Sequence, residues 1–351
     1  MTNLDDLEAL AEIDPHDARR VLAEFPAQCR RASTLRAAPP PDIGTPRVVV
    51  VAGMGGSAAG GDLLAACAAD AVDVPILVHR GYGLPALAGP DALVIACSYS
   101  GDTAEVLSAF DAAVTRRVPV VALTAGGALA QRAAAAGRPR VTLPGGLMPR
   151  MALGYLLLPA VALLEGCGVT VATAAEVDEA VAAVESLAPE LVPARPSADN
   201  EAKRLALSIG DRLPVIYGGP TTGAAAYRWK TDVEENAKRF ALAGTLPEMN
   251  HNEIEAWQGP AAKGMHVVLL RDAAEPPEIA QRFHILRDMI GPSAGGLSEA
   301  RGRGAGRLAR LLTLAYLGQW TSYYLAVLRG RDPWSVPLLD EFKRRVRRPL
   351  P

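Results

Sequence analysis

A run of β-branched residues, RVVVVA at positions 47–52, leads directly into a glycine-rich turn, GMGGS at positions 53–57, and then into a helical stretch. A continuous apolar run of this kind is typical of a strand that is buried on both faces of a parallel sheet. Glycines directly after the strand permit a tight turn into a helix. Further apolar runs alternate with helical patterns and lie at residues 75–79, 92–97, 118–124 and 140–143. This alternation predicts an α/β fold with a doubly wound parallel sheet.

The second half of the chain repeats this arrangement. A strand pattern at residues 213–217, LPVIY, is followed by a small-residue turn at 218–223, GGPTTG, and by a helical pattern. Aligning Gly53 with Gly218 superimposes both strand–turn–helix units, which indicates an internal duplication. Residues 266–270 predict another buried strand, and we expect the segment 291–310, rich in Gly, Ala and Arg, to be an exposed loop.

The length of 351 residues suits two domains. We predict an N-terminal helical segment at residues 1–35, a first domain at 36–190, and a second domain at 191–351 that ends in a C-terminal helix. The apolar stretch 311–328 contains Gly, Gln, Thr and Ser, so a buried core helix is favoured over a membrane span.

Charge and cysteine content restrict the class of protein. A net charge of -2 excludes a generally basic nucleic-acid binder. The four cysteines are scattered without metal-ligand spacing, which predicts free thiols in a reducing cytosol and no metal site. The acidic N-terminus lacks a signal-peptide pattern, so we expect a cytoplasmic protein that uses neither nucleic acid nor membrane as a partner.

The first candidate binding loop is formed by Gly55, Gly56 and Ser57. Glycines between a strand and a helix allow close approach of a ligand, and the amides at a helix start attract anions. A single phosphate suits Gly-Gly-Ser better than a dinucleotide does, because no acidic residue ends the next strand pattern, where His79 stands instead. Tight packing alone remains an alternative explanation for these glycines.

The second candidate loop is CSYSGDT at positions 97–103. The hydroxyls of Ser98, Ser100 and Thr103 surround a glycine between a strand and a helix, which predicts a neutral donor cup for phosphate oxygens. Capping of the helix would need one hydroxyl rather than three. Both loops follow neighbouring strands, and we expect them to converge where open α/β sheets bind ligands.

These two loops carry a resemblance to a known domain. GMGGSAAGGDL and CSYSGDTAEVL resemble the sugar isomerase (SIS) domain, a flavodoxin-like module that binds phosphosugars. Four further segments resemble the bifunctional phosphoglucose/phosphomannose isomerase family, which carries two such domains in tandem: LMPRMALG at 147–154, EENAK at 234–238, PEMNHNEI at 247–254, and Asp332-Pro333 followed by Lys343. The resemblance covers about residues 30–345.

The resemblance implies interconversion of glucose 6-phosphate and fructose 6-phosphate, and also mannose 6-phosphate, by metal-independent proton transfer through a cis-enediol(ate). It implies that Glu235 is the base, that His251 opens the sugar ring, and that Arg150 and Lys343 are active-site cations. It further implies a homodimer in which His251 comes from the partner subunit, and no cofactor. From the residues alone, a solvated surface group is the favoured interpretation of Glu235 in the middle of a helix, of Arg150 after a proline, and of Lys343 in a basic run. His251, in a polar loop, is explained equally well as a surface or capping histidine.

Two departures from the family pattern bear on the function. Asp102 replaces the usual loop Asn, so a carboxylate stands near the phosphate cup unless it points away or caps a helix. A threonine linked to mannose activity has no clear counterpart near Trp334 and Ser335. A non-catalytic phosphosugar sensor and an isomerase of a different phosphosugar therefore remain as alternatives, whereas an amidotransferase would need a glutaminase domain for which the chain has no room.

Overall fold

The computed structural model describes residues 2–36, 38–40 and 43–346, and its strands form two separate parallel sheets. The first sheet has the strand order β2-β1-β3-β4-β5, and the second has the order β7-β6-β8-β9. The first sheet contains β1 (Val48–Ala52), β2 (Ile76–His79), β3 (Ala92–Cys97), β4 (Val120–Thr124) and β5 (Arg140–Thr142). The second contains β6 (Leu213–Gly218), β7 (Leu242–Thr245), β8 (Met265–Arg271) and β9 (Gly296–Arg301).

The two sheets share one connectivity. In each, the first strand pairs with the second on one side and with the third on the other, and the fourth lies beyond the third. This confirms the predicted α/β class with two doubly wound parallel sheets, and it places β1 and β6 at equivalent positions, as the alignment of Gly53 with Gly218 predicts.

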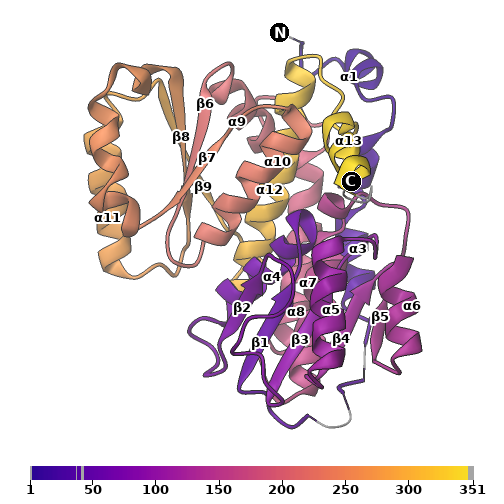
Figure 1. Cartoon of the computed structure of the whole chain (residues 1–351). Coiled ribbons are helices and arrows are strands. Elements are labelled where there is room, and N and C mark those ends of the chain that lie inside the picture. The colour runs from indigo at the N-terminus through magenta and orange to yellow at the C-terminus, as the bar shows by residue number, and fades with distance from the viewer. Residues whose placement is uncertain (1, 37, 41–42, 347–351) are drawn as a thin grey trace.

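Helices cover both faces of each sheet (Figure 1). On the first sheet these are α4 (Gly55–Ala68) and α7 (Leu153–Gly166) on one face and α5 (Ala104–Thr115) and α6 (Gly127–Ala135) on the other. On the second sheet they are α10 (Gly223–Ala237) and α12 (Arg307–Leu328) against α11 (Pro277–Ile290). Alternate residues of β1 point to opposite cores, because successive side chains of a strand face opposite ways: Val49 and Val51 join one cluster and Val50 the other.

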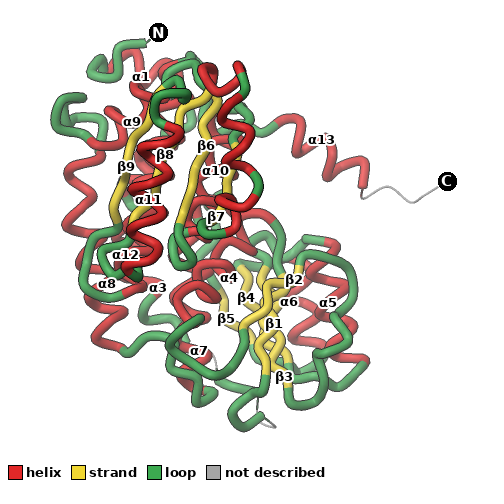
Figure 2. The backbone as a smooth tube through the Cα atoms, turned by 90° about the vertical axis from the view of Figure 1, so that its left-hand side faces the viewer, coloured by secondary structure: helices red, strands yellow, loops and turns green. Residues whose placement is uncertain are grey.

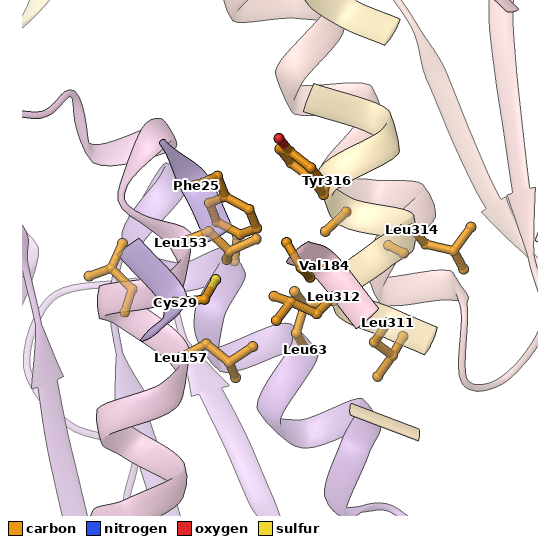
Figure 3. Packing of buried hydrophobic residues seen from close by; sticks show 14 of the residues in the cluster. Phe25, Cys29, Leu63, Leu153, Leu157, Val184, Leu311, Leu312, Leu314 and Tyr316 are labelled. Carbon is orange, nitrogen blue, oxygen red and sulfur yellow. The ribbon is translucent and has the colours of Figure 1, made fainter. Parts of the chain in front are cut away.

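A single large core joins the two sheets. It contains α12 together with α8 (Ala174–Leu191), α9 (Glu201–Ile209) and α3 (Phe25–Ala32). Figure 3 shows side chains of α3, α8 and α12 in this core. Nearly every residue of α12 is buried, which confirms the predicted core helix. A Cβ on Gly318 would lie 2.3 Å from Nε1 of Trp229. This glycine therefore lets α12 approach α10, where Trp229 donates a hydrogen bond to the Leu314 carbonyl.

The predicted N-terminal helical segment is present as three short helices, α1 (Leu7–Ile13), α2 (Ala18–Ala23) and α3. α1 ends at Asp14 and α2 begins after Asp17, while Glu24 separates α2 from α3. One sequence prediction needs correction. The segment 291–310 is not a loop: it contains β9, and α12 begins within it at Arg307. Small residues concealed this strand, and Gly296 is required there because a Cβ would lie 2.5 Å from the His266 ring.

The C-terminal helix α13 (Pro337–Val346) buries none of its residues and extends away from the rest of the molecule (Figure 2). Across the described ranges, none of the helices has the length and apolar character that a membrane crossing requires.

Candidate active site

The two predicted phosphate loops meet at the carboxyl ends of β1 and β3, which are neighbouring strands. The backbone N–H of Tyr99 donates a hydrogen bond of 3.2 Å to Oγ of Ser57 and so links the loops directly. The convergence expected from the strand order therefore occurs, and it lies where β2 and β3 flank β1 on opposite sides.

The hydroxyls of the second loop are partly engaged with one another. Oγ of the buried Ser98 lies 2.9 Å from Oγ1 of Thr103 and also accepts the Gly101 N–H. Oγ of the exposed Ser100 accepts the Asp102 N–H at 3.3 Å. One hydroxyl hydrogen of the Ser98–Thr103 pair is used between them, so the other and that of Ser100 remain to donate to an anion. Thr103 makes no side-chain capping bond to α5, against the capping alternative.

Asp102 points away from the cup. Its Oδ1 accepts the N–H of Ala128 at 3.0 Å, at the start of α6. A carboxylate at a helix N-terminus satisfies an otherwise unpaired amide and interacts favourably with the helix dipole. The carboxylate of Asp102, where the family usually has Asn, therefore binds the start of α6 and does not face the phosphate cup.

The first loop brings a third segment into the site. A Cβ on Gly56 would lie 2.7 Å from the backbone N and Cα of Arg150. Gly56 therefore permits the 3₁₀ helix η1 (Pro149–Met151) to pack directly on the start of α4. Gly55 has a φ of +50° and contacts nothing at its Cβ position, so its requirement is conformational.

Arg150 is buried, which overturns the surface reading of this residue. Its Nε donates to Oδ1 of Asn236 at 2.8 Å, and one Nη lies 3.4 Å from Oε2 of Glu235. The other Nη donates to the carbonyls of Pro333 at 3.0 Å and Trp334 at 2.7 Å. Burial lowers the pKa of the Arg150 guanidinium, an effect that the Glu235 carboxylate opposes. Arg150 thus joins η1 to α10 and to the segment before α13.

Glu235 lies in the last turn of α10, not in the middle of a helix as the sequence suggested. Its side chain is 27% exposed and is oriented by Arg150. A partly exposed carboxylate held by a buried arginine is able to accept a proton from a bound molecule.

A buried ion pair beneath Glu235 was missed by sequence reasoning. Arg228 and Asp232 of α10 are 2% and 1% exposed, and their charged atoms lie 2.7 Å apart. Arg228 also donates to the Arg150 carbonyl. Burial raises the pKa of Asp232 to about 7, against the opposing effect of Arg228. An Arg and an Asp four positions apart on a helix usually form a surface pair, so the sequence held no signal for this burial.

His251 and Lys343 stand apart from this group. His251 is exposed at the end of η2 (Glu248–His251), a 3₁₀ helix rather than the expected loop, and Lys343 is exposed on α13. Within the described part of the chain, neither forms a hydrogen bond or ion pair with Arg150 or Glu235. The described residues also contain no group of three or more His, Cys, Asp or Glu placed to hold a metal ion.

Comparisons with known proteins identify the fold. Residues 198–346 match the family described as "Bacterial phospho-glucose isomerase C-terminal SIS domain". The crystal structure of a glucose-6-phosphate isomerase-like protein from Thermus thermophilus superimposes with a TM-score of 0.65 at 23% identity, over 97% of this chain and 100% of that one. Two equivalent parallel sheets, with hydroxyl- and glycine-rich loops at the carboxyl edge of the first, thus define a tandem SIS-domain protein.

Curated relatives assign the chain to a narrower family. The bifunctional phosphoglucose/phosphomannose isomerase of Caldicellulosiruptor bescii is 38% identical over 85% of this chain and 89% of its own length. That of Aquifex aeolicus is 33% identical over 86% and 90%, respectively. The chain belongs to the bifunctional phosphoglucose/phosphomannose isomerase family.

Proposed function

We propose that this protein interconverts glucose 6-phosphate and fructose 6-phosphate, and also mannose 6-phosphate with fructose 6-phosphate. One observation carries the proposal: the Arg150–Glu235 pair is joined to the phosphate-type loops through the contact of η1 with Gly56. A phosphosugar whose phosphate occupies the loops would extend its reacting carbons toward a carboxylate. Membership of the isomerase family supports the same activity.

The proposed reaction moves one proton between two carbons. Glu235 removes the proton from C2 of the open-chain aldose to form an enediol(ate) and returns it to C1. A second proton leaves the C2 hydroxyl and one is added to the C1 oxygen, by exchange with solvent or a group of the site, so the ketose has the same atoms and electrons as the aldose. Four guanidinium hydrogens of Arg150 already have acceptors in Asn236, Glu235, Pro333 and Trp334. At most one N–H therefore remains for the substrate, and the main contribution of Arg150 is to hold Glu235 and to supply positive charge near the enediolate.

His251 and Lys343 would complete the site, the first by opening the cyclic sugar and the second as a further cation. Because both are exposed and separate from Glu235 in one chain, we propose a homodimer in which His251 enters the partner's site. The apolar face of α13 supports an assembled state, since Leu338 is 83% exposed and Phe342 is 64% exposed.

The proposed division into domains at residues 36–190 and 191–351 has the support of the two sheets, which lie one in each range. We also propose a cytoplasmic location, in keeping with four buried cysteines that are all free thiols.

The direct test is to incubate the protein with fructose 6-phosphate in excess EDTA and to separate the hexose phosphates. Glucose and mannose 6-phosphate should both appear. Their absence would refute the isomerase proposal, and activity lost only when EDTA is present would refute the metal-independent reaction.

Glu235→Gln tests the base. The amide keeps the shape of the side chain but cannot accept the proton, so kcat should fall by at least ~10²-fold with little change in phosphosugar affinity. Glu234→Gln is the matched control, because Glu234 is next in sequence and pairs at 2.8 Å with Lys230 outside the site. Equal kcat values for the two variants would exclude Glu235 as the base.

A further inference from the structure

Lys238 adopts a backbone conformation that is unfavourable for a lysine. It directly follows α10 with φ 53° and ψ 42°, the left-handed region that glycine or asparagine usually occupies at this position. A side chain with a Cβ costs roughly 1–2 kcal/mol in this region. The contacts of its ammonium group give a reason for a lysine here.

The ammonium group binds backbone carbonyls on both sides. Nζ donates to the carbonyl of Asn236 at 3.1 Å and to that of Asp332 at 2.5 Å. Arg150 holds the next two carbonyls, those of Pro333 and Trp334. Two cations, one at the end of α10 and one on η1, thus hold three consecutive carbonyls of the chain.

The segment 332–334 is also constrained from within. The Asp332 carboxylate accepts the backbone N–H groups of Trp334 at 2.8 Å and Ser335 at 3.3 Å. Three residues later α13 begins, and it buries none of its own residues (Figure 2). Because none of the residues of α13 is buried, we infer that its position depends mainly on this held segment.

We propose that Lys238 is a positioning residue for the isomerisation: together with Arg150 it holds the segment 332–334 and thereby sets where α13 and Lys343 stand relative to Glu235. The proposal deepens the proposed function and rests on it, because it requires Lys343 to act in the site.

The charges around Lys238 predict how pH affects this contact. Lys238 is exposed as a residue, but partial burial of its ammonium group lowers its pKa to about 8. Nearby Arg150 and Arg331 act in the same direction, whereas Asp332 and Glu235 oppose them. The ammonium therefore loses its proton as the pH rises through about 8, while the guanidinium of Arg150 remains charged. Charge-assisted bonds are roughly twice as strong as neutral ones, so the hold on the segment weakens above this pH.

The test compares Lys238→Met, Lys238→Arg and the control Lys230→Met, which removes an α10 lysine outside the site. In Lys238→Met, kcat should fall about tenfold or more, because misplacing a catalytic group by ~1 Å costs rates of this order. The KM for fructose 6-phosphate should stay near the wild-type value, because the phosphate loops are untouched. Lys238→Arg should recover most of kcat and lose the decline in kcat above pH 8.

A double-mutant cycle with Lys343→Met separates positioning from a general loss of structure. If Lys238 acts through Lys343, Lys238→Met should cause no further loss of kcat in the Lys343→Met protein. Multiplied losses would overturn the proposal, as would a fully active Lys343→Met. Should Lys238→Met fail to fold, Lys238→Gln, which keeps N–H donors but carries no charge, replaces it in the cycle, and multiplied losses again overturn the proposal. Conversion of fructose 6-phosphate by the wild-type protein tests the proposed function separately.

Discussion

Substituting Gly56 by alanine adds one methyl group at the contact on which the candidate site is built. The new Cβ would lie 2.7 Å from the backbone N and Cα of Arg150 and 2.8 Å from the carbonyl carbon of Pro149. Ordinary van der Waals contact begins near 3.4 Å, so η1 must move by about 0.7 Å. Backbone atoms cannot rotate out of the way as the end of a flexible side chain can, so the displacement carries Arg150 with it.

Two measurable effects follow from this displacement. Overpacking of a close contact costs about 1–3 kcal/mol, so the free energy of unfolding should fall by that amount. A displacement of about 1 Å in a catalytic group can lower a reaction rate by the order of 10²-fold. Because η1 moves by somewhat less, kcat for isomerisation should fall about 10- to 100-fold. A loss of about 1–3 kcal/mol should leave the variant folded at the assay temperature. The fall in kcat should therefore exceed the fraction of protein lost to unfolding.

The assay measures kcat with fructose 6-phosphate and the free energy of unfolding in urea, with two control variants. Gly145→Ala adds a methyl group where nothing lies within 4 Å, so neither quantity should change. Gly137→Ala, just after α6 and outside the candidate site, also meets no atom but forces a φ of +60° on alanine, so stability alone should fall by roughly 1–2 kcal/mol. If Gly56→Ala behaves like Gly137→Ala, with stability lost and kcat kept, then the position of Arg150 does not control the reaction.

Two further predictions concern the assembly and the acid stability. Glu235→Gln and His251→Ala chains should each be nearly inactive alone. When equal amounts are refolded together, half of the random dimers contain one intact shared site, so roughly one quarter of the wild-type sites should be regained. No recovery despite verified subunit exchange would exclude the shared site. Burial lowers the pKa of His266 to about 4 from an ordinary 6.5, with a smaller contribution from Arg212, so the unfolded chain binds a proton that the folded chain does not as pH falls between these values. Stability should therefore decline from pH 6.5 to pH 4 more steeply in the wild type than in His266→Asn, and parallel melting curves would contradict this.

Local patterns predicted the five strands of the first sheet and, in the second sheet, β6 and β8 but not β7 or β9. The run at residues 47–52 indicated a doubly buried strand, and the glycines and hydroxyls after β1 and β3 indicated the carboxyl edge of the first sheet. Each of these signals lies within a few consecutive residues, where strand burial and turn geometry are determined locally. β9 was missed because its first residue, Gly296, is determined by its close approach to the His266 ring and not by strand propensity.

The relations between distant segments were decided only by the tertiary structure. Arg150 is buried because Gly56 admits η1 and because Asn236 and the carbonyls of residues 333 and 334 accept its hydrogen bonds, partners 86 to 184 positions away in sequence. Contacts between distant elements likewise determine three other features: the burial of Arg228 and Asp232, the hydrogen bond of Asp102 to α6, and the hydrogen bond of Lys238 to residue 332. Short-range patterns report a residue's own element, whereas burial and charge environment depend on which elements the fold brings together, and that information is not present in any one stretch of sequence.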